Sequence, residues 1–115
     1  CHSRPNTICM THMSHVYPQG ANLYFIFLAK MSSLEEFKAY HAGILDAIQK
    51  SGAAMSHHHG IGKMFGPWLE GAVGRNEYGV IRALKQYFDP DNIMNPGGTL
   101  GLDVPQEEKR FLKAL

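Results

Sequence analysis

Three consecutive histidines, His57, His58 and His59, stand inside the chain, directly before residues 60–63, Gly-Ile-Gly-Lys. Imidazole titrates near neutral pH, so such residues can act as an acid, a base, a metal ligand or the partner of an anion. In an extended segment His57 and His59 would share one side, and His58 would face the other. The internal position argues against a purification tag, whereas a solvated loop of histidines stays open as the plain alternative.

The two glycines after the histidines precede a region with helical spacing. Backbone N–H groups at such a position, together with the ammonium group of Lys63, can face an anion. The longer spacing and the Lys-Ser/Thr ending of a phosphate-binding P-loop are missing. A tight turn that needs glycine is therefore the alternative to an anion site.

Two further side chains of chemical interest lie earlier in the chain. Tyr24 stands in an aromatic-rich run, where packing is the common role of a tyrosine and proton transfer the rarer one. His15 comes just before a predicted turn, a place where functional residues often collect. A partly exposed structural histidine is the alternative for His15.

The elements that must position these residues follow from periodicity. Residues 7–17 alternate as a strand does, Pro18-Gln19-Gly20 has turn chemistry, and residues 22–28 form a second, apolar strand, so the pair predicts a hairpin. Ser32 and Glu35 fit a capping box at the start of an amphipathic helix that ends near Ser51-Gly52. The short run 53–56 is predicted as a third strand.

The second half of the chain is predicted to be mainly helical. Pro67 suits the first position of a short helix that runs through Ala72, and residues 77–88 form another helix that Asp89-Pro90 ends. Residues 95–98, Asn-Pro-Gly-Gly, predict a tight turn, and residues 106–115 a last helical piece. We expect an α+β fold in one domain that spans residues 1–115.

Composition excludes several classes of function. The chain has 115 residues and a formal net charge of +1 without a basic block, so we expect small-molecule partners and no nucleic acid. The longest apolar stretch, 21–29, is too short to span a bilayer. Cys1 and Cys9 lie near one end and would staple little of the fold, which favours a reduced, cytoplasmic setting. The opening, without Met or a signal sequence, is typical of a fragment of a longer protein.

Three blocks of sequence resemble the C-terminal domain of FAD-linked oxidases of the vanillyl-alcohol-oxidase type. They are residues 14–27 (Ser-His-Val-Tyr-Pro-Gln-Gly-Ala-Asn-Leu-Tyr-Phe-Ile-Phe), 52–63 (Gly-Ala-Ala-Met-Ser-His-His-His-Gly-Ile-Gly-Lys) and 84–97 (Leu-Lys-Gln-Tyr-Phe-Asp-Pro-Asp-Asn-Ile-Met-Asn-Pro-Gly). The resemblance implies half of a ferredoxin-like cap, with β-β-α-β order, followed by helices. It also implies FAD as cofactor and an N-terminal FAD-binding domain as partner, which these residues do not include.

Within this superfamily the likeness is closest to the alkylglycerone-phosphate synthases. These enzymes use FAD without net redox and exchange the acyl group of acyl-glycerone phosphate for a fatty alcohol, in ether lipid synthesis. The resemblance then implies that Tyr24, His57, His58 and His59 are catalytic or phosphate-facing. His15 and Lys63 would bind substrate.

The competing branch contains the D-lactate, glycolate and D-2-hydroxyglutarate dehydrogenases. Its pattern supplies two histidines and a glutamate that can hold a divalent metal. Here His15 keeps the first histidine, Tyr24 stands at the second, and His58 replaces the glutamate. This exchange removes the mixed-ligand character of the site, so we expect no bound metal.

The resemblance also assigns cofactor contacts. His59 keeps the family position beside the flavin and can move a proton in either branch. Asn95 matches a turn near the flavin domain, with a plain β-turn as the alternative. An isolated piece of this kind exposes surfaces that it normally buries, so a homodimer is possible. A non-enzymatic, metal-binding domain is the third class of function.

Overall fold

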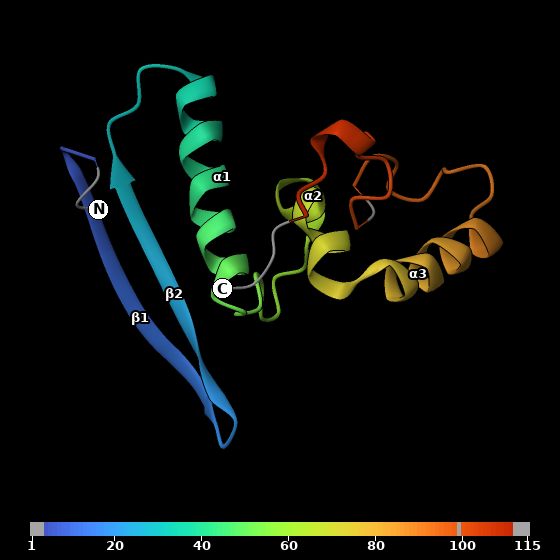
Figure 1. Ribbon diagram of the computed structural model, residues 1–115, viewed down its shortest axis with the longest axis horizontal. Helices are drawn as coiled ribbons and strands as arrows, with labels where there is room; N and C mark the ends of the chain where they lie inside the picture. Colours follow the sequence, from blue (N-terminus) through green and yellow to red (C-terminus); the bar gives the residue numbers. More distant parts are fainter. Residues whose placement is uncertain (1–3, 99, 112–115) are drawn as a thin grey trace. The chain divides into compact units, whose positions relative to one another are not determined.

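The computed structural model describes residues 4–98 and 100–111 and shows an α+β arrangement, as predicted (Figure 1). The elements, in chain order, are β1 (Thr7–Tyr17), β2 (Gly20–Ala29), α1 (Leu34–Lys50), α2 (Gly62–Val73), α3 (Arg75–Phe88) and a single 3-10 turn, η1 (Gln106–Glu108). They form two compact units, Cys1–Tyr40 and His41–Leu115, with the boundary inside α1. Each unit is described by itself. None of the described helices is long and apolar enough to cross a membrane.

The first unit is built on an antiparallel hairpin whose register runs from Thr7 opposite Ala29 to Ser14 opposite Asn22. Because side chains alternate across a strand, the hairpin has two distinct faces. One face carries Cys9 and Phe27, and the ring of Phe27 meets the ring of Tyr40 of α1 edge-on at 6.1 Å. The other face carries the pairs Ile8–Leu28, Met10–Ile26, His12–Tyr24 and Ser14–Asn22.

Helix α1 begins with a reciprocal cap. The Glu36 N–H donates to Ser33 Oγ at 3.1 Å, and the Glu36 carboxylate accepts the Ser32 N–H at 2.6 Å. This backbone N–H, together with the guanidinium of Arg4, lowers the pKa of Glu36. The predicted cap of Ser32 with Glu35 was therefore one residue too early.

Among the described residues of the second unit, four hydrophobic side chains are buried and form its core: Leu45, Trp68, Leu69 and Tyr78. Two of them also satisfy their polar atoms, as buried aromatic residues usually do. Trp68 Nε1 donates to Asp46 Oδ1 at 2.8 Å, and the Tyr78 hydroxyl donates to the Gly101 carbonyl at 2.7 Å. The core therefore joins α1, α2 and α3 to the chain beyond them.

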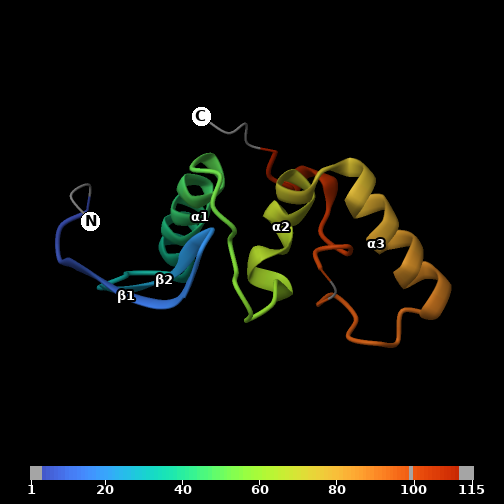
Figure 2. The ribbon, with the colours of Figure 1, turned by 90° about the horizontal axis from the view of Figure 1, so that it is seen from below.

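The tail, residues 101–110, runs back along α2 (Figure 2). A Cβ added at Gly66 would lie 2.8 Å from the Cα of Gly101, so the two backbones touch where neither residue has a side chain. Further on, the Arg110 N–H donates to the Pro67 carbonyl at 2.8 Å, and Lys109 pairs with Glu70 at 2.7 Å. The tail is thus a structural part of this unit.

Several predicted boundaries were wrong. Residues 53–56 form no strand, because this short segment pairs with neither described strand and stays irregular. Helix α2 starts at Gly62 and contains Pro67, which was predicted at its first position. Helix α3 begins two residues earlier than predicted. The last helical piece is only the turn η1, and residues 112–115 lie outside the described residues.

Candidate functional site

Tyr24 is half-buried in β2 and stands directly opposite His12 of β1. Their rings lie 5.9 Å apart between centroids and are tilted by 34°. His12 is exposed, so the pair is accessible from the face of the hairpin that also carries Asn22. The Asn22 Nδ2 atom is shielded from solvent and has no hydrogen-bond partner. This face therefore carries titratable and hydrogen-bonding groups side by side.

His15 lies in a β-bulge. The register shifts between Ser14 and Val16, and His15 takes a left-handed backbone conformation with φ of 51°. A bulge inserts one extra residue and re-aims its side chain, and bulges are common beside active sites. The His15 Nδ1 atom is 3.0 Å from Ser14 Oγ, which holds the imidazole close to the strand.

The three histidines of the run are exposed and lie in an irregular segment before α2. Their rings contact each other in sequence. The centroids of His57 and His58 are 5.1 Å apart and those of His58 and His59 are 4.3 Å apart, both nearly perpendicular. The segment is thus neither a strand nor a helix, and its irregular backbone gathers the three rings.

Glycines shape the step from the histidines into α2. Gly60 and Gly62 have φ of 81° and 55°, in the left-handed region that favours glycine, and an added Cβ at either would meet nothing within 4 Å. Helix α2 has no side-chain N-cap and no acidic residue in its first turn. Lys63 is exposed in that turn. The start of α2 is therefore open and positively polarised.

The predicted turn at residues 95–98 is present and lies beside the start of α2. The Gly98 N–H donates to the Asn95 carbonyl at 3.1 Å, and a Cβ added at Gly97 would be 3.8 Å from Lys63 Nζ. The Asn95 side chain lies against Gly98, since a Cβ there would be 2.6 Å from Asn95 Oδ1. Both the carbonyl and the side chain of Asn95 therefore contact Gly98 of the same turn.

An ion pair between Lys85 and Asp89, called the clasp below, binds the chain between α3 and this turn. The buried Asp89 accepts the Lys85 ammonium and the N–H groups of Ile93 and Met94, each N–H at 2.9 Å. The Lys85 ammonium also donates to the Met94 carbonyl at 2.9 Å. The Lys85 hydrogen bond, followed by the two backbone N–H groups, lowers the pKa of Asp89.

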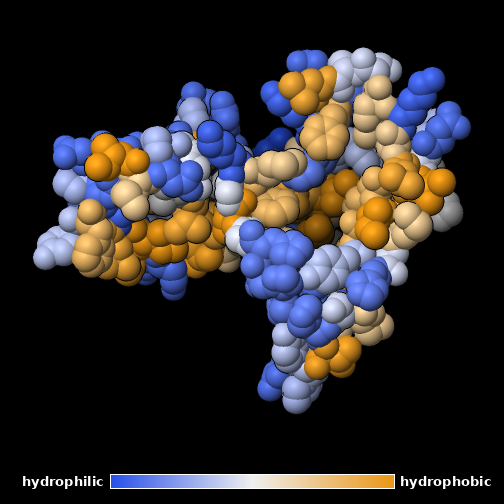
Figure 3. All heavy atoms as spheres, turned by 180° about the vertical axis from the view of Figure 1, so that it is seen from behind, coloured by the Kyte–Doolittle hydropathy of each residue, from blue (hydrophilic) through white to orange (hydrophobic). Residues whose placement is uncertain are grey.

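Hydrophobic side chains remain exposed in both units. In the second unit they form a band over α3 in the space-filling view, and Val80, Leu84, Tyr87 and Phe88 are more than half exposed (Figure 3). Ile93 and Met94, beyond the clasp, are exposed as well. Contiguous apolar surface of this kind is typical of an interface with another protein part.

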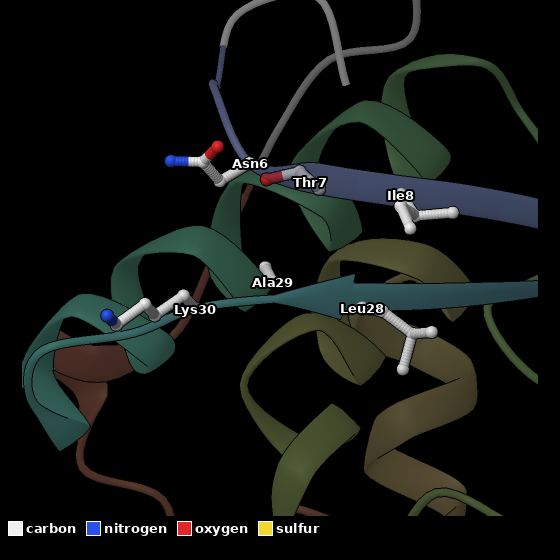
Figure 4. Close-up of a pocket in the computed structure, with 6 residues that line it drawn as sticks. All are labelled: Asn6, Thr7, Ile8, Leu28, Ala29 and Lys30. Carbon is white, nitrogen blue, oxygen red and sulfur yellow. The ribbon is translucent and has the colours of Figure 1, made fainter.

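An open hollow lies at the end of the hairpin away from its turn (Figure 4). Its lining residues are Asn6, Thr7, Ile8, Leu28, Ala29 and Lys30. Tyr24 precedes Leu28 by four residues in β2, which is about 13 Å at the usual strand rise. The hollow is therefore separate from the residues that the sequence singled out.

The structure thus brings the predicted residues together in part. In the second unit it gathers His57, His58 and His59, and it places Lys63 beside the Asn95 turn. Tyr24 and His15 belong to the first unit. Tyr24 lies within the regular register of β1 and β2, whereas His15 follows Ser14, where that register shifts.

Sequence reasoning missed two features. His12 carries no motif of its own, and only its cross-strand register reveals that it faces Tyr24. Lys85 and Asp89 are four residues apart, a spacing that is typical of an ion pair on a helix. Asp89 was interpreted only as the end of the helix, and this ion pair was not predicted.

Comparison with known proteins identifies the family. The family model described as FAD linked oxidases, C-terminal domain, matches residues 2–99. An alkyldihydroxyacetonephosphate synthase of Dictyostelium discoideum is 39% identical over 80% of this chain and 15% of its own length. A synthase of the same name from Trypanosoma brucei brucei is 33% identical over 90% of this chain and 17% of its own length.

A second kind of relative carries an oxidoreductase name. The uncharacterized FAD-linked oxidoreductase YgcU of Escherichia coli K12 is 34% identical over 84% of this chain and 21% of its own length. The chain thus spans about a fifth or less of these relatives. No solved structure matches the chain. With its family model covering most of the sequence and its relatives pointing to FAD, the chain belongs to the C-terminal domain family of FAD-linked oxidases.

Proposed function

We propose that this chain is the substrate-side domain of a flavoenzyme of the alkyldihydroxyacetonephosphate synthase type. The observation that carries the proposal is the 39% identity to the Dictyostelium discoideum synthase over 80% of the chain. The synthases of Trypanosoma brucei brucei and Caenorhabditis elegans, at 33% and 34% identity, support the same assignment. The reaction proposed is the exchange of an acyl for an alkyl group on glycerone phosphate.

The site residues divide into two roles in this proposal. Tyr24 and the histidines His57, His58 and His59 transfer or hold protons at the substrate, since phenol and imidazole are the usual side chains for this task. Lys63, in the first turn of α2, and His15, in the bulge, bind substrate in this proposal. The open, uncapped start of α2 supports this role, because such a helix end favours an anion.

His59 is the proposed contact of this chain with the flavin ring. His59 is exposed, and a Cβ added at the following Gly60 would meet nothing within 4 Å, which supports the approach of a flat group to this segment. When bound, FAD would supply the reactive ring of the exchange, without net redox. Asn95 is the weaker cofactor contact, because its side chain already lies against its own turn.

The proposed partner is the FAD-binding part of the same protein. The exposed apolar side chains of α3 support this proposal, because they match the kind of surface that a domain interface buries. The cytoplasm is the proposed compartment.

A hydroxy-acid dehydrogenase is the second candidate function. It is favoured by the glycolate oxidase subunit GlcD of Bacillus subtilis, which is 33% identical over 62% of the chain and 15% of its own length. In this reading His59 would accept the hydroxyl proton, and FAD, when bound, would accept the hydride from the substrate. A metal-binding domain is the third candidate, and near-stoichiometric zinc that survives dialysis would support it.

The absorbance spectrum of the full-length protein separates the candidates. Flavin bands that bleach when a hydroxy acid is added without oxygen would identify a dehydrogenase. A bound flavin that stays oxidised with hydroxy acids, together with ether-bond formation from acyl-glycerone phosphate and a fatty alcohol, would support the synthase. A protein without flavin would contradict both.

The site assignment has its own test in the full-length protein. We expect His59→Ala and Tyr24→Phe each to lower turnover by about 10²- to 10⁴-fold, the range for losing an acid or base, with FAD still bound. Tyr17→Phe is the matched control, because it removes the same hydroxyl from an exposed tyrosine of the same hairpin. Unchanged turnover in both site variants would reject the assignment.

A further inference from the structure

His12 lies where it can act on Tyr24. The two residues are direct register partners, and such partners have Cβ atoms about 4.5–5.5 Å apart on one face of the sheet. The centroid distance of 5.9 Å shows that the rings are in contact. For a proton to pass between such partners, an imidazole nitrogen and the phenol oxygen must come within hydrogen-bond reach, directly or through one water.

The neighbours of the pair make its interaction selective. Met10 and Ile26 form the adjacent pair on the same face, and neither can titrate. The other titratable side chains of the hairpin are Cys9, His15 and Tyr17. Cys9 points to the opposite face, and the two others lie at or beyond the bulge. Within the hairpin, His12 is therefore the ionisable partner of Tyr24.

The position of the bulge gives a second reason to pair His12 with Tyr24. Regular pairing holds through Ser14 and Asn22 and then shifts at His15, so the strands are locked in register where His12 meets Tyr24. One-residue slippage would turn His12 to the other face, because side chains alternate with a period of two. The pair is thus set by the backbone as well as by side-chain contact.

We propose that His12 is a positioning residue that orients Tyr24 and accepts its phenolic proton. This inference rests on the proposed role of Tyr24 in catalysis. The O–H bond of Tyr24 breaks and an N–H bond forms on the imidazole, so a neutral pair becomes phenolate and imidazolium with no change in total charge. The phenolate then takes a proton from the substrate, which restores neutral Tyr24, and the imidazolium gives its proton to the product before the product leaves, which restores neutral His12.

The first test is spectroscopic and needs no substrate. Full-length protein is labelled with ¹³C in its tyrosine rings, and the Tyr24 resonance is assigned by its loss in Tyr24→Phe. Histidine changes charge between about pH 5 and 8, so the Tyr24 resonance should move over that range in the wild type. It should stay fixed in His12→Phe, which keeps a ring but cannot titrate.

Thr11→Val is the matched control, since Thr11 is next to His12 but belongs to the other face. The Tyr24 resonance should move in this variant as in the wild type. Movement that persists in His12→Phe, or none in the wild type, would overturn the proposal. If His12→Phe does not fold, His12→Gln replaces it, because glutamine keeps hydrogen bonding without titration.

The second test is kinetic. His12→Phe should lower kcat by about tenfold or more and leave KM nearly unchanged, and the neutral limb of the pH profile of kcat should disappear. In a Tyr24→Phe background the same change should cost nothing further, because the two residues act as a unit. Additive losses would overturn the proposal. If Tyr24→Phe itself keeps full turnover, the proposed function of Tyr24 fails, while the spectroscopic result still decides the contact.

Discussion

Replacing Gly66 by alanine tests whether the tail is a structural part of the second unit. The new Cβ would lie 2.8 Å from the Cα and 3.2 Å from the amide nitrogen of Gly101. Contacts this short to backbone atoms cannot be relieved by a side-chain rotation. The tail must therefore move away from α2, and the helix that carries Lys63 loses its support.

The magnitude follows from two opposing effects. Alanine is better than glycine inside a helix by about 0.8–1.0 kcal/mol. Forcing an extra methyl group into a packed contact costs about 1–3 kcal/mol. The steric cost wins because the obstacle is backbone, so we expect Gly66→Ala to lower the free energy of unfolding by up to about 2 kcal/mol.

Gly79→Ala is the matched control. Gly79 lies inside α3, and an added Cβ would meet nothing within 4 Å. The same exchange should there raise the free energy of unfolding by about 0.5–1 kcal/mol. Urea unfolding, followed by the fluorescence of Trp68, the single tryptophan of the chain, measures both. Stabilisation of similar size in the two variants would refute the packing argument.

Two predictions concern pH. Burial lowers the pKa of His41 below 6.5, so the unfolded chain takes up a proton first as the pH falls, and stability should decline below about pH 6.5. His41→Phe, which can keep the ring contacts with Phe65 and Trp68, should flatten this decline in urea titrations, and an unchanged slope would contradict it. Asp89 has a lowered pKa, chiefly through Lys85, so its stabilising effect is present above pH 3.8 and is lost as the pH falls through the lower folded value. Asp89→Asn should therefore weaken the acid dependence of unfolding, and an acid transition identical to that of the wild type would contradict the clasp.

The hairpin was predictable because its signal is local. Alternation over residues 7–17 and the turn Pro18-Gln19-Gly20 were sufficient to predict β1 and the turn that follows. The bulge at His15 could not be predicted, since it depends on how two strands of unequal length are brought into register. For the same reason the contact of His12 with Tyr24 was not visible in the sequence.

Helix starts were ambiguous for a physical reason. Ser32 with Glu35 and Ser33 with Glu36 both satisfy the capping pattern, and the sequence alone gives them equal weight. Arg4, far away in the chain, pairs with Glu36 and adds to the second arrangement. Similarly, Pro67 suggested a helix start, but the helix continues through it, and its carbonyl binds the Arg110 N–H of the tail.

The residues of the candidate site come from the sequence, and their roles stay predictions. Motif resemblance indicates the histidine run, Tyr24 and Lys63, because these residues lie within blocks that resemble the family. The neighbourhood of Lys63 and the Asn95 turn was not predictable, since it joins segments whose approach depends on the packing of α2 and α3.

The tail along α2 also has a consequence for the order in which the second unit forms. Lys109 and Glu70 are 39 residues apart, and the contact of Arg110 with Asp46 closes an even longer loop. Closing such loops costs entropy before the contacts can repay it. During synthesis α2 and α3 therefore emerge before the segment that completes their packing, and the second unit gains its full stability only when residues 101–110 have left the ribosome.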